Sequence, residues 1–353
     1  MKNELIAKSF VFGIVVLFFG ASVTSAYDIE PSLSSQPMDR GNILYVGGGG
    51  LGNYSSIQEA INNATNGDTI FVYNNTYNEN VDTKLKKITL LGEDRDTTII
   101  AGSAANPVLK IGTSDTTLSG FTLIGTPTGI IIQVASLSEN IFITNNLIKD
   151  GSNGIVLSAT TSKVTITGNT IKNNAFIGIQ LQSSSYDIIQ GNTIENNGAQ
   201  GIDLSLNSNH NSFLNNSIMN NAKEAILISG IASTENSIEG NNIYQNQIGV
   251  RFTSAGSNKI QSNNIEGSVM EGVLLQTSKE NTIEMNNFID NNRQATFKLS
   301  SRNTWDANYW SNWIGFKLTS PIFQKFPKAI IGGLRINFDK NPAKVPYNIS
   351  AVL

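Results

Sequence analysis

Short runs of alternating apolar and polar residues fill most of the chain, and asparagine, glycine and serine separate them. In Gly178–Leu181 the apolar side chains stand two positions apart, and in Ile166–Ile171 aliphatic residues bracket polar ones. A period of two predicts strands with one buried face. Helices are not expected here, because the runs are too short and contain many β-branched residues and Asn-Asn pairs.

These runs recur as a tandem repeat of about 23 residues. Successive copies of one asparagine are separated by 23, 23, 24, 25, 22 and 23 residues: Asn146, Asn169, Asn192, Asn216, Asn241, Asn263 and Asn286. Three short strands with their turns fit in one repeat, which predicts one coil of an all-β, parallel β-helix solenoid. A leucine-rich repeat has a similar length, but its Leu-x-x-Leu-x-Leu pattern is absent.

A solenoid of this kind explains the recurring asparagines and glycines. Coils stacked by parallel strand pairing at roughly 4.8 Å bury columns of aliphatic side chains. Each coil must turn corners, where left-handed backbone conformations favour Gly and Asn. Stacked Asn side chains can also hydrogen-bond to the backbone of the next coil. We therefore expect the Asn columns to be structural and not to bind a ligand.

The N-terminal residues have the pattern of an export signal. Lys2 and Lys8 form a positively charged start, and an apolar run over residues 10–19 follows. This run is short for a membrane span, and the small residues 24–26 suit a cleavage site. We predict a signal peptide over residues 1–26 and an exported protein, at the cell surface, outside the cell or in a periplasm-like space. The alternative is an uncleaved anchor, through which alone the chain would contact a membrane.

The remaining chain divides into four parts. We predict a flexible leader over residues 27–42, an N-terminal cap over 43–68, β-helix repeats over 69–302, and a Trp-rich C-terminal cap or module over 303–353. Repeat arrays need caps, because their end coils would otherwise expose apolar columns and open strand edges.

The N-terminal cap is expected to contain a strand at residues 43–46 and a short helix. Ser56 opens the helix, and Glu59 stands at the third position after it, which is the arrangement of a capping box. A further strand is expected at residues 69–73, after an Asn-Gly-Asp turn.

The composition agrees with one long domain of 353 residues. Charged residues make up 14% and the net charge is −3, with no basic patch, so nucleic acid is not an expected partner. The chain has no cysteine, so strand ladders and not disulfides must hold it together. The oligomeric state stays open.

No cofactor and no metal site is predicted. Gly47, Gly49 and Gly52 match a Gly-x-Gly-x-x-Gly pattern between a strand and a helix, but no acidic residue ends the next strand and a solenoid follows. The single histidine, His210, is expected in an exposed corner between coils. Cysteine is absent and no column of Asp offers a calcium site.

The outer face of the coils offers one candidate site. In each Gly-Ile-x-Leu motif the side chain x points outward, and this position is predicted to hold Ile131, Val156, Gln180, Asp203, Leu227, Arg251 and Leu274. Asp203 and Arg251 would lie two coils apart, roughly 10 Å, where with Gln180 they could bracket a sugar unit or remain solvated surface charges.

A second outward column carries Lys149, Lys172 and Glu195, and the last two are expected to form a weak surface pair. No two carboxylates stand at matched positions in neighbouring coils, so the carboxylate pair of a glycoside hydrolase is not evident and no catalytic residue is predicted.

Aromatic residues form a second candidate site for carbohydrate. Trp305, Tyr309, Trp310 and Trp313 are the densest aromatic group. Their spacing of four and three suits one face of a helix. The rings could stack on sugars, or they could pack inside the C-terminal cap.

Several segments resemble the NosD-like group of the pectin-lyase-like superfamily. The segments Tyr54–Ile61, Gly67–Val72 and Ile88–Glu93, together with Tyr45-Val-Gly-Gly-Gly, resemble its N-terminal start. Asn303–Trp310 resembles the Trp-rich close of exported, mostly archaeal members. The resemblance implies a right-handed parallel β-helix and a carbohydrate-binding or sugar-hydrolysis module. The superfamily's Asp clusters, Gly-His-Gly turn and catalytic Arg motifs have no match here.

Three functions therefore stay open. The first is a non-catalytic exported protein that binds or displays a polysaccharide or surface glycan. The second is a polysaccharide lyase or glycoside hydrolase acting on the outer face. The third is an accessory to copper delivery, as the resemblance implies for the name-giving protein of the family, although His, Met and Cys are scarce.

Overall fold

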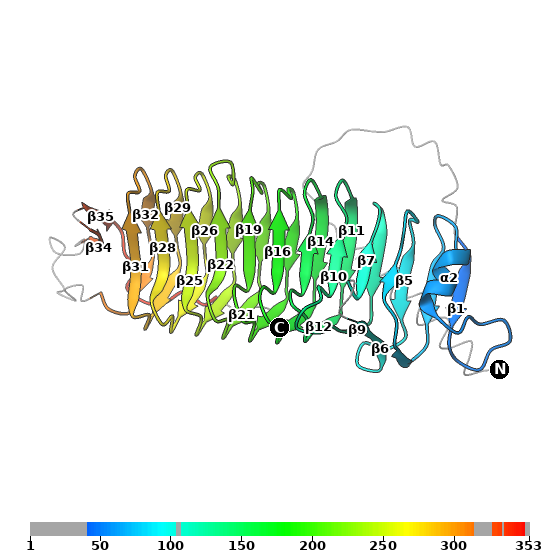
Figure 1. Ribbon diagram of the computed structural model, residues 1–353. Coiled ribbons are helices and arrows are strands. Elements are labelled where there is room, and N and C mark those ends of the chain that lie inside the picture. Colours follow the sequence, from blue (N-terminus) through cyan, green and yellow to red (C-terminus); the bar gives the residue numbers. More distant parts are fainter. Residues whose placement is uncertain (1–40, 104–106, 314–326, 334, 350–353) are drawn as a thin grey trace, which may run out of the picture. The chain divides into compact units, whose positions relative to one another are not determined.

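The computed structural model describes residues 41–103, 107–313, 327–333 and 335–349. The predicted leader and signal peptide therefore lie almost entirely outside the described residues. Within them, each coil contributes one strand to each of three parallel sheets, and successive coils stack side by side (Figure 1). Three strands per repeat of about 23 residues confirm the predicted solenoid.

The largest sheet has 14 strands. In pairing order they are β1 (Ile43–Val46), β2 (Thr69–Val72), β5 (Thr89–Gly92), β8 (Thr116–Ser119), β11 (Glu139–Thr144), β14 (Ser162–Thr167), β17 (Ile188–Gln190), β20 (Ser212–Leu214), β23 (Ser237–Glu239), β26 (Lys259–Gln261), β29 (Thr282–Glu284), β32 (Thr304–Asp306), β35 (Arg335–Asp339) and β34 (Lys328–Gly332). The sheet already begins with β1, inside the segment predicted as the N-terminal cap.

A second sheet has 10 strands and carries the candidate site. In chain order they are β4 (Val81–Asp82), β7 (Leu109–Ile111), β10 (Ile132–Val134), β13 (Ile155–Leu157), β16 (Ile179–Gln182), β19 (Ile202–Ser205), β22 (Glu224–Ser229), β25 (Ile248–Thr253), β28 (Glu271–Gln276) and β31 (Arg293–Lys298).

The third sheet has 11 strands. In chain order they are β3 (Asn75–Tyr77), β6 (Thr98–Ala101), β9 (Thr122–Ile124), β12 (Leu147–Lys149), β15 (Thr170–Lys172), β18 (Thr193–Glu195), β21 (Ser217–Met219), β24 (Asn242–Tyr244), β27 (Asn264–Glu266), β30 (Asn287–Ile289) and β33 (Tyr309–Trp310).

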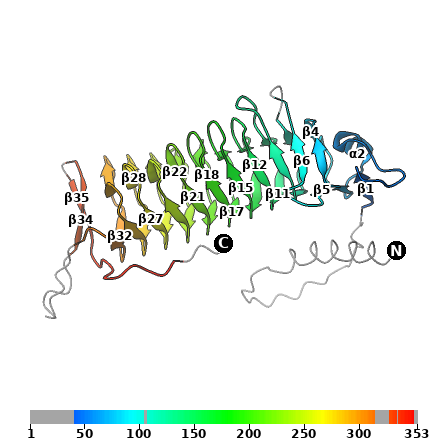
Figure 2. The ribbon, with the colours of Figure 1, turned by 90° about the horizontal axis from the view of Figure 1, so that it is seen from below.

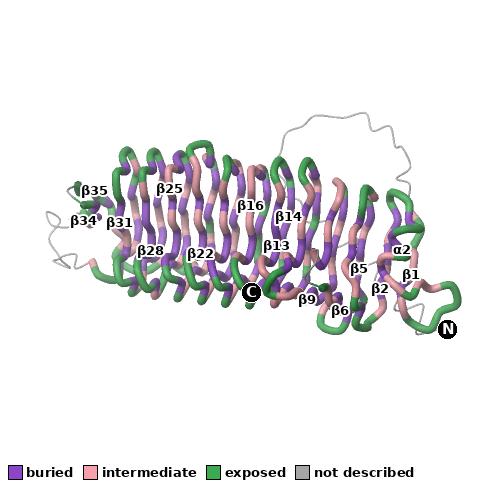
Figure 3. Tube along the Cα trace, in the orientation of Figure 1, coloured by how far each residue is buried: buried purple, intermediate pink, exposed green. Residues whose placement is uncertain are grey.

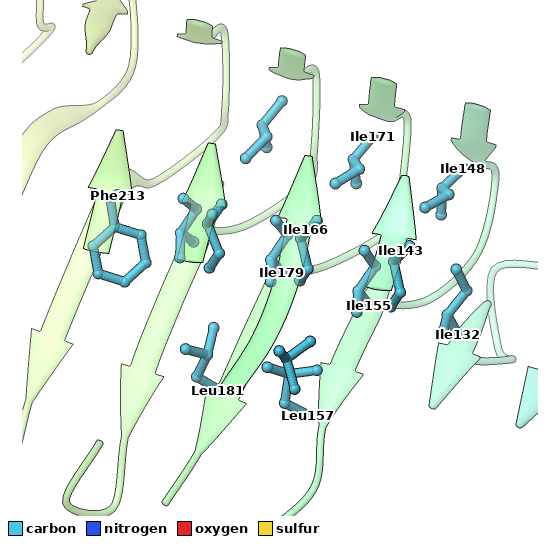
Figure 4. Close-up of a cluster of buried hydrophobic side chains, with 14 of the residues drawn as sticks. Ile132, Ile143, Ile148, Ile155, Leu157, Ile166, Ile171, Ile179, Leu181 and Phe213 are labelled. Carbon is cyan, nitrogen blue, oxygen red and sulfur yellow. The ribbon is translucent and has the colours of Figure 1, made fainter. Parts of the chain in front are cut away.

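Inward-facing aliphatic side chains stack in columns along the coils. Ile148 pairs with Ile171, and Ile166 pairs with Ile189, so identical side chains lie one above the other. All four are fully buried. Figure 4 shows such stacked side chains, which come from all three sheets. Figure 3 shows buried residues along the strands and exposed ones at the turns. The period of two thus translates directly into the core.

The seven repeated asparagines form a buried ladder inside one corner. The backbone N–H of Asn146 donates to Oδ1 of Asn169 at 2.9 Å, and Asn169 repeats this bond to Asn192. The side-chain Nδ2 of Asn192 also donates to the carbonyl of Ile166, in the preceding coil. The predicted structural role of the column is confirmed.

The left-handed residue of this corner precedes the ladder asparagine. It is Asn145 (φ 51°) in one coil and Gly168 (φ 64°) in the next, but also Ser262 (φ 53°) and Met285 (φ 54°) later in the chain. The expectation that Gly and Asn occupy these conformations was therefore too narrow. Tertiary hydrogen bonds of the ladder hold the turn even where the local residue disfavours it.

Two further ladders line the other corners. The second contains Asn174, Asn197, Asn221 and Asn246. The third contains Asp187, Asn211, Asn236, Asn258, Asn281 and Asn303. The third ladder therefore begins with a carboxyl group where its other members have an amide.

This buried carboxyl group is expected to make stability depend on pH. Asp187 accepts hydrogen bonds from the Val164 N–H and the Ser184 hydroxyl. Burial nevertheless raises the pKa of Asp187 to about 7, and those two hydrogen bonds oppose the rise. The folded protein thus keeps a proton that the unfolded chain releases above its ordinary pKa of 3.8. The contribution of Asp187 to stability is fully present below pH 3.8 and is lost as the pH rises towards 7.

The variant Asp187→Asn extends the amide ladder and removes the titration. Between pH 4 and pH 8 we expect it to lose about 3 kcal/mol less unfolding free energy than the wild type. Urea unfolding at both pH values measures the difference. Asp150→Asn, at a half-buried corner, is the control and should lose as much unfolding free energy between the two pH values as the wild type. If Asp187→Asn and the wild type lost equal unfolding free energy between pH 4 and pH 8, a raised pKa of Asp187 would be contradicted.

The predicted helix is α2 (Ile57–Asn63), which lies beside the first coil (Figure 1). The Ser56 hydroxyl accepts from the Glu59 N–H at 3.1 Å, as the capping box requires. Glu79 accepts from the first backbone N–H groups, and Lys86 donates to the last carbonyls. Charges of the right sign thus stabilise both helix ends. This helix is the only one within the described ranges, and it is too short to cross a membrane.

The C-terminal end of the stack is closed by an antiparallel hairpin, β34–β35. Asp339, fully buried on β35, accepts through Oδ2 from the backbone N–H and side-chain Nδ2 of Asn308, at 2.9 and 3.0 Å. Trp310 Nε1 donates to the same oxygen at 3.0 Å. Asn308 itself is the last member of the first ladder. A carboxylate therefore ends the ladder where its donors would otherwise be unpaired.

Candidate functional site

The outward column of the 10-stranded sheet holds the predicted site residues. From β10 to β31 it consists of Gln133, Val156, Gln180, Asp203, Leu227, Arg251, Leu274 and Thr296. Ile131 was wrongly assigned to it. Because β10 begins two residues later than the motif suggested, Ile132 pairs with Ile155, and Ile131 is fully buried.

Arg251 and Asp203 lie two coils apart, as predicted, but Arg251 is held by other groups. Its Nη1 donates to Glu224 Oε1 at 3.1 Å, and its Nη2 donates to Gln276 Oε1 at 2.8 Å. The Glu224 side chain is only 5% exposed and also accepts from Gln200 Nε2 at 3.0 Å. The sequence analysis did not identify Glu224 as a site residue, because Glu224 is the first residue of β22 and does not occupy position x of the Gly-Ile-x-Leu motif.

Asp203 is an acid that keeps its proton unusually well. Its pKa is raised to about 6, mainly by burial and to a smaller extent by the negative charge of Glu224. The hydrogen bond with Gln180 and the charge of Lys223 act in the opposite direction. The carboxyl groups of Asp203 and Glu224 therefore interact between neighbouring coils. They do not occupy equivalent positions of the repeat, since Asp203 pairs with Leu227.

An open groove of about 430 Å³ lies over these strands. Seven polar or charged residues and one leucine line it: Gln200, Lys223, Glu224, Leu227, Ser229, Gln247, Arg251 and Thr253. Within the described part of the chain, the buried Nε of Arg251 has no hydrogen-bond partner. One buried donor beside the groove thus lacks a partner among the described residues.

A second ion pair extends the charged strip on this sheet. Arg293 Nη2 bonds to Glu271 Oε1, and the Glu271 side chain is only 3% exposed. The other oxygen, Glu271 Oε2, is buried and likewise has no partner among the described residues. The strip therefore offers both an unpaired donor and an unpaired acceptor.

The aromatic candidates lie on other sheets, so the structure does not bring them to the groove. Trp305 and Trp310 are on β32 and β33, strands and not a helix face, and are 3% and 1% exposed. Trp310 stacks on Phe288 with ring centroids 4.3 Å apart. These two rings fill the cap, so their faces are not open to a sugar. Tyr309 and Trp313 are half-buried at the same end.

The predicted surface pair on the 11-stranded sheet forms weakly. Lys172 Nζ and Glu195 Oε1 are 3.8 Å apart, in register on β15 and β18. An exposed pair of this kind contributes at most about 1 kcal/mol and points to no site.

His210 occupies a corner, with a left-handed φ of 56°. Its Nε2 lies 2.7 Å from Glu235 Oε2, and its ring stacks on Tyr186 at 4.8 Å. Among the residues that the structure describes, no three His, Cys, Asp or Glu side chains group as metal ligands would. These residues do not fit a copper site, so we derive no role for one.

Two family models match overlapping parts of the chain. Residues 106–237 match the model described as right handed beta helix region, and residues 204–315 match the model described as periplasmic copper-binding protein (NosD). The suggested archaeal origin is not supported. The comparison with curated proteins gave no match.

Solved structures share the fold at low sequence identity. The A-module of mannuronan C-5 epimerase AlgE4 from Azotobacter vinelandii is 14% identical, with a TM-score of 0.63 over 68% of this chain and 79% of that one. The Dettilon tailspike protein is 15% identical, with a TM-score of 0.61 over 72% and 58%. XylC in complex with xylose is 12% identical, with a TM-score of 0.57 over 76% and 75%. Identities this low establish a common β-helix fold.

Proposed function

We propose, for a chain that contains a right-handed β-helix region and a NosD region, that the protein is exported and binds a carbohydrate chain along the groove of the 10-stranded sheet. The lining of this groove carries the proposal: the Arg251 side chain is 31% exposed there, beside Gln200 and Gln247. A sugar hydroxyl can accept a hydrogen bond from a guanidinium or amide N–H. The similarity to XylC, whose structure contains xylose, supports this ligand class.

The groove suits a chain and not a single small molecule. Coils repeat at roughly 4.8 Å, so polar side chains recur along the solenoid axis. Gln180, Gln200 and Gln276 place amides around the Asp203–Arg251 segment. Amide and guanidinium groups in such a row can donate to successive hydroxyl or carboxylate groups of a polysaccharide.

Removal of the Arg251 side chain tests the proposal. We expect Arg251→Ala to weaken binding of the retained polysaccharide at least tenfold, because it removes the guanidinium from the groove and leaves the buried Glu224 without its ion-pair partner. Affinity electrophoresis against neutral and acidic plant, microbial and envelope polysaccharides measures the loss.

A matched control is Arg302→Ala. Arg302 also pairs with a carboxylate, Glu280, at 2.9 Å, but lies outside the groove. Its removal should leave binding unchanged. Equal weakening by both substitutions, or no polysaccharide retained by the folded wild type, would refute the groove as a carbohydrate site.

A second candidate function is cleavage of the bound chain. The raised pKa of Asp203 favours it, because a carboxyl group protonated near pH 6 can donate to a glycosidic oxygen. Glu224 is then the neighbouring carboxylate that takes a proton from the attacking water. Bond cleavage and addition of water balance without a cofactor.

Asp203→Asn should lower the cleavage rate at least 100-fold while binding is retained. Wild-type activity should decline as the pH rises through about 6, since the acid form of Asp203 disappears. Product mass spectrometry measures both, and an unsaturated end would identify a lyase in place of a hydrolase. Asp150→Asn serves as the control. Intact polymers from every member of the panel would leave binding as the sole function of the groove.

A further inference from the structure

The last described residues form a segment outside the solenoid sheets. Residues 341–349, here called the strap, follow β35 and run back along the outside of the 11-stranded sheet (Figure 2). The strap lies beside strands that are 60 to 85 residues earlier in the chain. It is therefore a long-range contact of the fold.

Two asparagine side chains bind the strap through its backbone. Asn287 Oδ1 accepts from the Tyr347 N–H at 2.8 Å, and Asn287 Nδ2 donates to the Tyr347 carbonyl at 2.9 Å. One amide thus satisfies both backbone groups of one residue. In the preceding coil, Asn264 Nδ2 donates to the Ile349 carbonyl at 2.9 Å.

These asparagines belong to one outward column. Asn242, Asn264 and Asn287 pair in register on β24, β27 and β30. The strap advances two residues, from Tyr347 to Ile349, while the column advances one coil. A coil repeat of roughly 4.8 Å is shorter than the rise of two fully extended residues. A peptide that is less than fully extended can therefore keep this register.

The strap also has one side-chain anchor and one strand-like contact. The Tyr347 hydroxyl donates to the Ala307 carbonyl at 2.5 Å. The Ala343 N–H donates to the Asn308 carbonyl at 2.9 Å, so the strap starts on the open edge of β33. Tyrosine at position 347 is therefore the residue that gives the contact sequence specificity.

Apolar burial contributes little to the strap. Lys344, Val345, Pro346 and Asn348 are exposed, and Val345 is 70% exposed. Pro346 fixes its own backbone and favours an extended conformation in Val345 before it, which lowers the entropy lost on docking. A segment held by hydrogen bonds at its edge can detach without opening the core.

We propose that Asn264 and Asn287 form a peptide-binding site, and that the strap is a detachable segment that fills this site in its own chain. The site recognises the backbone of an extended peptide and the hydroxyl of one tyrosine. A strap from a second copy of the chain fits the same site when the resident strap is absent.

The test uses a chain that ends at Asn341, which retains Asp339, and a fluorescent peptide of residues 342–353. Fluorescence anisotropy should show saturable binding of the peptide to the shortened chain and none to the full chain, whose site is filled. Asn287→Ala in the shortened chain should weaken binding at least tenfold. The peptide with Tyr347→Phe should also bind more weakly. Absence of binding to the folded shortened chain, or equal binding by Asn287→Ala, overturns the proposal.

Hydrogen exchange on the full chain gives an independent test if the shortened chain does not fold. The amide of Tyr347 should exchange at least 100-fold faster than that of Ile265, in the buried core, and faster still in full-length Asn287→Ala. Equal protection of the two amides would show that the strap opens only with the core, and would overturn the proposal.

Discussion

Asp339→Ala is expected to lower the free energy of unfolding by about 4 kcal/mol. The substitution leaves two donors of Asn308 and the indole N–H of Trp310 without their common acceptor. All three are buried, so water does not replace the carboxylate. Each orphaned donor costs about 1–3 kcal/mol, and the sum is limited by partial relaxation. The end coil would lose the group that terminates the ladder.

Urea denaturation followed by tryptophan fluorescence measures this loss, because Trp305 and Trp310 lie in the affected cap. Asp339→Asn keeps an acceptor oxygen and should lose only about 1–2 kcal/mol. Asp96→Ala removes an exposed aspartate of a surface pair and should stay within about 0.5 kcal/mol of the wild type. If Asp339→Ala matched Asp96→Ala, the carboxylate would not stabilise the end of the ladder.

Asn216→Ala should destabilise the middle of the solenoid by a similar amount, about 4 kcal/mol. Asn216 Oδ1 accepts from both the N–H and the Nδ2 of Asn192 at 3.0 Å. Its own Nδ2 donates to the Ile189 carbonyl at 2.8 Å and to Asn241 Oδ1 at 3.0 Å. Alanine removes all four bonds and leaves a small buried void. Because each coil contacts only its neighbours, the loss weakens the junction between two coils directly.

Thermal and urea unfolding of Asn216→Ala check this value. The matched control is Asn292→Ala, at an exposed position, with an expected change within about 0.5 kcal/mol. A small effect at both positions would mean that aliphatic stacking alone holds the coils together, and that the ladder is dispensable.

The coil architecture was predictable because the sequence repeats it. Gly154-Ile-Val-Leu and Gly178-Ile-Gln-Leu became β13 and β16 in the expected register. The N-cap bond of Ser56 and the strand at Ile43–Val46 also formed as predicted. Each of these signals is local, so a short window of sequence contains the information.

Predictions failed where the position of a residue depended on strand pairing with the neighbouring coil. Ile131 was placed outside because Gly129-Ile-Ile-Ile was aligned with Gly154-Ile-Val-Leu, whereas the pairing of Ile132 with Ile155 sets Ile131 at the position of Gly154. The spacing of Trp305 and Trp310 resembled a helix face, but strand pairing with the preceding coil placed both inside the cap. Tertiary pairing overrides such short patterns.

The groove likewise contains residues that the sequence predicted and one that it did not. Asp203 and Arg251 were found from the sequence, because both occupy the outward position of the repeat. Glu224 was not, because it reaches Arg251 diagonally between coils from a different position. The raised pKa of Asp203 follows from burial and from that same neighbour, so no comparison of equal positions reveals it.

The sequence by itself determined the repeat length, the alternation that buries one face of every strand, and the asparagines that join successive coils. These follow from periodicity and from hydrogen-bonding capacity, which each repeat carries alone. Only the tertiary structure decided that Glu224 pairs with Arg251, that Asp339 ends the ladder, and that Asn287 binds Tyr347. Those contacts join residues 27, 31 and 60 positions apart, and stacking and chain reversal, not local pattern, bring them together.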